Sequence, residues 1–92
     1  MNRKELQEAL RREHIQDRCY SLEAKNFDPD EALCLRQESG KWVVYYSERG
    51  LQTGKQVFKL EADACLYMLE SLRSDPTTKV GWNSGFSTTG GA

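Results

Sequence analysis

The chain has few of the residues that mark catalytic, metal-binding or disulfide-bonded proteins. In 92 residues it has one histidine, two prolines and three cysteines. Cys19, Cys34 and Cys65 are an odd set without paired spacing such as C-x-x-C, so neither a disulfide framework nor a zinc site is indicated. They are typical of small buried apolar side chains. His14 lies in a charged segment, and a Cys–His pair would need a tertiary coincidence.

The chain also lacks long apolar runs and a large net charge of either sign. No run approaches the roughly 20 apolar residues that cross a bilayer, and the first residues lack the apolar stretch of a secretory signal. The formal net charge is only −1, although residues 19–40 are mainly acidic and residues 41–60 mainly basic. We therefore expect a cytoplasmic protein without membrane contact, cofactor or metal ion.

The composition is typical of one small soluble domain, with 38% hydrophobic and 29% charged residues. We predict a single domain over residues 1–76. Residues 77–92 are rich in Gly, Ser and Thr and contain no acidic residue, so we predict a C-terminal tail. Trp82 and Phe86 are unusual in a linker and favour a tail that folds back on the domain or enters an interface.

The apolar and aromatic run over residues 41–50 is the clearest local signal. β-branched and aromatic side chains suit a pleated surface, and Gly40 and Gly50 bound the run, so we predict a central strand. Trp42, Val44 and Tyr46 then share one face, and Val43, Tyr45 and Ser47 share the other. Because both faces are largely apolar, the second face must be covered or must await a partner.

Two helices and three further strands surround this run in the prediction. Asn2 and Glu5 are spaced as in a capping box, which indicates a helix over residues 3–14. A second helix is indicated over residues 61–73, with an apolar stripe through Ala62, Cys65, Leu66, Leu69 and Leu72. Shorter strands are expected at 19–22, 32–37 and 55–59, with a tight turn at 38–40. The predicted class is α+β, an antiparallel three- to four-stranded sheet flanked by an N-terminal and a C-terminal helix (α-β-β-β(-β)-α).

The sequence offers little for catalysis. Asp28, Asp30 and Glu31 form the only dense group of carboxylates, and a solvated turn is the ordinary interpretation of such a group beside proline. Glu48 and Arg49, as neighbours in a strand, point to opposite faces and cannot grip one substrate together. We therefore predict that the chain is not an enzyme.

The order of elements is also that of double-stranded RNA-binding domains, which join a helix, an antiparallel sheet and a second helix. In those domains a basic helix N-terminus meets the phosphates. Here Glu61-Ala62-Asp63 occupies that position and would repel a phosphate backbone. A small nucleic-acid-binding module therefore stays an alternative, and direct nucleic-acid binding is not expected.

Several segments resemble a family of small bacterial immunity proteins, which are encoded beside polymorphic or contact-dependent growth-inhibition toxins. The resemblance covers roughly residues 1–75, and its most distinctive part is W-x-V-Y-Y-S-E-R-G from Trp42 to Gly50. The other segments are 20–22, 33–35, Phe58 and 64–69. The resemblance implies a cytoplasmic protein that binds a cognate toxin C-terminal domain and blocks it. Toxins of this class are often nucleases.

Such an inhibitor has a physical route to its partner. Carboxylates would steer a basic toxin cleft, and aromatic side chains would carry the binding energy. We expect Trp42 and Tyr46 to be buried in the core, and Tyr45 and Trp82 to face the partner. The predicted toxin-binding residues are Asp28, Asp30, Glu31, Glu38, Tyr45, Glu48, Arg49 and Trp82.

Overall fold

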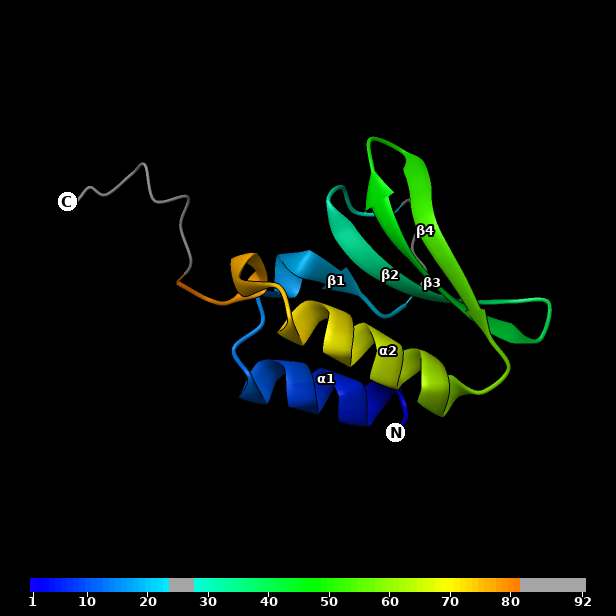
Figure 1. Ribbon diagram of the computed structural model, residues 1–92, viewed down its shortest axis with the longest axis horizontal. Helices are drawn as coiled ribbons and strands as arrows, with labels where there is room; N and C mark the ends of the chain where they lie inside the picture. The colour runs from blue at the N-terminus through cyan, green and yellow to red at the C-terminus, as the bar shows by residue number, and fades with distance from the viewer. Residues whose placement is uncertain (24–27, 82–92) are drawn as a thin grey trace.

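Two helices lie side by side on one face of a four-stranded sheet (Figure 1). The computed structural model describes residues 1–23 and 28–81. The strands follow one another across the sheet in chain order, and the α+β class predicted from the sequence is confirmed. The elements are α1 (Arg3–Arg12), β1 (Tyr20–Ser21), β2 (Ala32–Glu38), β3 (Lys41–Glu48), β4 (Leu51–Phe58) and α2 (Glu61–Arg73), with short 3-10 helices at Asp17–Cys19 and Pro76–Thr78.

The sheet is mixed, so the prediction of a purely antiparallel sheet is wrong. Strands β2, β3 and β4 are antiparallel, but β1 runs parallel to β2, with Tyr20 opposite Leu33. β1 ends at Ser21 and β2 begins at Ala32, which is too long a separation for a tight turn. A tight turn after β1 would instead have made a hairpin.

Two hairpins with two-residue turns fix the antiparallel part. Ser39 and Gly40 both have positive φ (51° and 78°), as do Arg49 and Gly50 (52° and 80°). Positive φ at both central positions is typical of type I′ turns, whose twist matches that of the strands. The first turn lies where the sequence predicts it. The second places Arg49 in the turn rather than in the strand.

Strand β4 begins at Leu51, four residues earlier than predicted. The segment 51–54 was expected to connect two strands, but the pairing with β3 is interrupted only at Gly54 and Lys55, which lie opposite Tyr45. Gly54 has φ 62°, and the register shifts between Val44 and Tyr46 on the partner strand. A glycine in the left-handed region with one extra residue is typical of a β-bulge, which absorbs the irregularity without ending the strand.

The helix boundaries follow the capping signals. The Asn2 side chain accepts a hydrogen bond from the Glu5 N–H (2.9 Å), and the Glu5 carboxylate accepts one from the Asn2 N–H (3.0 Å), which confirms the capping box. α1 ends at Arg12, two residues before the predicted end, while α2 has the predicted bounds. The predicted apolar stripe of α2 is rotated, because Ala62 and Leu66 are exposed.

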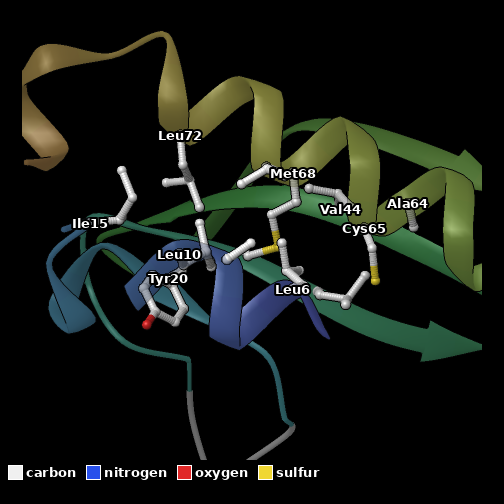
Figure 2. Close-up of a cluster of buried hydrophobic side chains, with 12 residues drawn as sticks. Leu6, Leu10, Ile15, Tyr20, Val44, Ala64, Cys65, Met68 and Leu72 are labelled. Carbon is white, nitrogen blue, oxygen red and sulfur yellow. The ribbon is translucent and has the colours of Figure 1, made fainter. Parts of the chain in front are cut away.

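The core lies between the helices and the inner face of the sheet (Figure 2). Leu6 and Leu10 of α1 meet Met68 and Leu72 of α2 there, above Val44 of β3. Cys65 is buried in this core and Cys34 under the opposite face, which agrees with their interpretation as small apolar side chains; Cys19 is half-buried.

Beyond residue 76 the chain still makes hydrogen bonds to the segment after α1. Gln16 N–H donates to the Thr78 carbonyl (2.7 Å), and Val80 N–H donates to the His14 carbonyl (2.6 Å). Thr78 is buried, and its hydroxyl contacts the Leu72 carbonyl at 2.8 Å. The segment after α2 is therefore joined to the segment after α1, which fixes the end of α2 against the sheet. Within residues 1–23 and 28–81 no helix is both long and apolar enough to span a membrane.

Candidate functional site

The sheet face opposite the helices carries a buried polar network centred on Asp28. The Tyr45 hydroxyl donates to Asp28 Oδ2 (2.7 Å), and Arg36 Nη2 donates to Asp28 Oδ1 (2.9 Å). Arg36 is 8% exposed and also donates to the Ser21 carbonyl and hydroxyl (3.2 and 3.0 Å). The hydrogen bond from Tyr45, followed by the hydrogen bond and charge of Arg36, lowers the pKa of Asp28 against the opposing effect of burial.

Two of the predicted toxin-binding residues, Tyr45 and Asp28, form contacts within the domain in this network. Tyr45 is 2% exposed, and burial together with its hydrogen bond to Asp28 raises the pKa of its hydroxyl. Asp28 uses both carboxylate oxygens within the domain. The two residues therefore fix the segment before β2 onto the sheet, and Tyr45 presents almost no surface to a partner.

Asp30, two residues further along, joins that segment to the β3–β4 turn. The Arg49 backbone N–H donates to Asp30 Oδ1 at 2.6 Å. Glu31 follows with φ 55° and an exposed side chain, and Glu48 is exposed at the end of β3. The structure thus brings four of the predicted residues, Asp30, Glu31, Glu48 and Arg49, to one end of the sheet.

Tyr46 lies among these carboxylates, which reverses the expectation for the two tyrosines. It is 36% exposed, while Tyr45 is the buried one. Partial burial, followed by the negative charges of Glu48, Glu31 and Asp30, raises the pKa of the Tyr46 hydroxyl. We call Asp30, Glu31, Tyr46 and Glu48 the Tyr46 surface. Tyr46 is on the sheet face that α1 and α2 cover, but the helices leave this end of the sheet partly open.

A signal for this surface was present in the sequence. A two-residue turn at Ser39-Gly40 fixes the register of β2 against β3, with Glu38 opposite Lys41 and Ala32 opposite Ser47. Extending the register by one position places Glu31 beside Glu48. The choice between Tyr45 and Tyr46 had no such signal, because alternation says which residues share a face but not how far the rest of the chain covers that face at each position.

A groove of about 320 Å³ adjoins the Tyr46 surface. It lies between the end of the sheet and the C-terminal end of α2 with the 3-10 helix that follows. Its apolar lining includes Cys19, Leu33 and Leu72, and the Tyr46 side chain forms part of the wall. Glu31, Asp75 and Arg18 supply the charged groups. No pattern in the sequence indicated this groove, because its walls come from four separate parts of the chain.

Two other predicted residues do not join the Tyr46 surface. Glu38 lies at the far end of β2, about 20 Å from its start at the usual rise of a strand, and pairs with Lys55 (2.9 Å). Trp82 lies outside the described residues, as does Phe86. The assignment of Glu38 and Trp82 to a toxin-binding surface stays a prediction.

A larger concave surface of about 960 Å³ runs along α1 and β1. Four basic residues, Arg3, Lys4, Arg11 and Arg18, line it together with the acidic Asp17 and Glu23. Arg3 is partly engaged elsewhere, because its guanidinium lies 5.4 Å from the centre of the Trp42 ring and its backbone N–H donates to Glu61.

The described residues contain no group of three or more His, Cys, Asp or Glu side chains arranged to hold a metal ion. Comparison of the chain with family models, with curated proteins and with solved structures finds no match. The site is therefore interpreted from its own geometry.

Proposed function

We propose that this chain is an immunity protein that binds a basic toxin domain through the Tyr46 surface and neutralises it in the cytoplasm. One observation supports the proposal above all. The three exposed carboxylates of Asp30, Glu31 and Glu48 lie around the partly exposed Tyr46 at one end of the sheet. Carboxylates of this kind steer a basic partner and speed its association. An aromatic ring at the centre of such a patch supplies the buried contact area that dominates binding energy.

The hydrogen bonds that hold the Tyr46 surface in place support this role. Asp28 is fixed by Arg36 and Tyr45, and Asp30 by the backbone of Arg49. The carboxylate-bearing segment is therefore ordered before a partner arrives, so that less conformational entropy is lost on binding. Electrostatic steering speeds the binding of a toxin, and a segment that is already ordered strengthens it. An inhibitor that must capture a toxin quickly benefits from both.

The function is tested by producing the chain with the toxin domain encoded beside it. We expect growth to be restored and a stable complex to be isolated. Glu31→Gln with Glu48→Gln should slow association and flatten its dependence on salt, since the variant removes two of the steering charges. Glu8→Gln with Glu70→Gln is the matched control, because it removes the same charge from exposed helical positions.

Two results would contradict the proposal in different ways. A wild-type chain that neither restores growth nor binds the toxin domain is not its immunity protein. Normal complex formation with equal association rates and salt slopes for both double variants would show that the partner binds elsewhere on the chain.

The basic groove along α1 favours nucleic acid as a second candidate partner. Arg3, Lys4, Arg11 and Arg18 would contact phosphates there, and the affinity would fall steeply with salt. Against this, Glu61 and the exposed Asp63 occupy the first turn of α2, where the RNA-binding layout places basic residues. A mobility-shift titration with double-stranded RNA decides this candidate, and a salt-sensitive shift abolished by Lys4→Gln with Arg11→Gln would establish it.

A further inference from the structure

We propose that the groove beside Tyr46 receives a single arginine side chain of the toxin domain. The inference rests on the proposed function and names the group that the site recognises. Its basis is the combination of an apolar interior, an aromatic wall and a carboxylate-bearing rim within one concavity of limited size.

The size of the groove suits one side chain. At about 320 Å³ it stands at the lower end of the roughly 300–1,000 Å³ range of small-ligand sites. A helix or strand of the partner is too large to enter it. A long side chain that projects from the partner surface would fill it and leave the two protein surfaces in contact around the rim.

The lining favours a side chain with an apolar stem. Leu33, Leu72 and Cys19 come from β2, α2 and the 3-10 helix before β1, and Leu72 is 4% exposed because it also belongs to the core. Methylene groups packed on these residues would be removed from water, as in the usual burial of arginine and lysine stems. These apolar residues are therefore suited to the methylene groups of a long side chain, while the charged residues lie at the rim of the groove.

The charges of the groove favour a cation over an apolar or anionic tip. Glu31 and Asp75 line it, and Glu48 and Asp30 lie near Tyr46. Arg18 is the opposing charge among the lining residues, and its Nε donates to Gln16 Oε1 (2.9 Å). An apolar tip would remove the Glu31 and Asp75 carboxylates from water without compensation, which is costly. An anion would be repelled.

Arginine fits this combination better than lysine. Its planar guanidinium stacks on aromatic rings and donates to two carboxylates at once, whereas the lysine ammonium is a compact and strongly hydrated charge. Tyr46 supplies the ring. Glu31 lines the groove from the segment before β2 and Asp75 from the segment after α2, and we propose that one planar group contacts both. Asp75 Oδ1 already accepts from Thr77, and its second oxygen is the proposed acceptor.

The decisive experiment is a double-mutant cycle on the full chain and the toxin domain. Glu31→Gln and Asp75→Asn are combined in the chain, and each surface arginine and lysine of the toxin domain is replaced by alanine in turn. Asn at position 75 keeps the carbonyl oxygen that accepts from Thr77. We expect one arginine whose replacement weakens binding by about tenfold or more to the wild-type chain and has little effect on the double variant.

Replacement of that arginine by lysine should restore only part of the affinity. A complex in which no toxin arginine is coupled to Glu31 and Asp75 would overturn the groove assignment and leave the immunity function intact. Coupling of a lysine alone, with no arginine coupled, would also overturn it.

A second measurement tests whether the groove binds arginine when the toxin domain itself does not bind to the chain. The wild-type chain is titrated with N-acetyl-arginine amide and, as the uncharged control of the same shape, with N-acetyl-citrulline amide, while backbone amide signals are followed by NMR. We expect the arginine probe alone to shift the signals of Leu33, Tyr46 and Thr78, and Tyr46→Ala to abolish the shifts. In that case, equal responses to the two probes, or no response at these residues, would overturn the inference.

Discussion

Replacing Asp28 by asparagine is expected to destabilise the domain by about 2 kcal/mol. The carboxylate accepts hydrogen bonds from Tyr45 (2.7 Å) and Arg36 (2.9 Å), and hydrogen bonds to charged groups contribute about 1.5–3 kcal/mol each. Breaking a fully buried ion pair costs about 3–5 kcal/mol, but the Asp28 side chain is 26% exposed, which lowers the expected cost. Asparagine keeps the shape and one acceptor oxygen, so the loss reports on the charge.

The effect should depend on pH in a defined direction. The pKa of Asp28 is lowered in the folded domain, so its ionised form is stabilised by folding. That contribution is fully present above the unfolded pKa of about 3.9 and is lost as the pH falls through the lower folded value. The difference in unfolding free energy between wild type and variant should thus be largest near neutral pH and shrink below about pH 4.

Urea unfolding followed by circular dichroism at several pH values measures this difference. Glu8→Gln is the control, because Glu8 is exposed on α1, and its effect on stability should be small at every pH. Equal stability of Asp28→Asn and wild type, or a difference that does not change between neutral and acidic pH, would refute the assignment of Asp28 to a stabilising charged network.

Three further predictions concern the core, a turn and the cysteines. Met68→Ala should lower the unfolding free energy by about 2–5 kcal/mol in urea titrations, since Met68 is fully buried between the helices and the sheet, and a loss below about 1 kcal/mol would contradict that packing. Gly50→Ala should cost about 1 kcal/mol because of its φ of 80°, with no steric clash to add to it, and Gly50→Asn should cost less; equal stability of all three proteins would argue against the turn. Burial raises the pKa of the Cys34 and Cys65 thiols to about 11, so both should react with iodoacetamide far more slowly in the folded than in the urea-unfolded chain, and equal rates would place them at the surface.

Local signals in the sequence were enough to locate most of the secondary structure. The capping box at Asn2 and Glu5 marks the start of α1, and the Ser39-Gly40 turn marks the first hairpin. Pro76 follows the end of α2, where proline commonly stops a helix. Each of these signals depends on residues that are close together in the sequence. A sequence pattern is therefore enough to locate the end of the helix or the turn.

The candidate site was predicted in part for the same reason. Asp30, Glu31 and Glu48 were recognised by residue type, and the hairpin register implied that Glu31 and Glu48 lie side by side. The role of Asp28 was not predictable from its acidic neighbourhood. It depends on Arg36 and Tyr45, which reach the same point only because β2 and β3 pair across the sheet.

The sequence by itself determined the α+β class, the helices, the first hairpin and the acidic character of the segment before β2. Only the tertiary structure decided that β1 runs parallel to β2, that Tyr46 rather than Tyr45 is exposed, and that a groove opens beside it. The physical reason is that strand alternation divides residues between two faces without saying how far the rest of the chain covers each face at a given position. α1 and α2 pack on the face that includes Tyr46 but leave this end open, whereas Tyr45 is buried on the other face, where it donates a hydrogen bond to Asp28. These contacts join residues far apart in the chain.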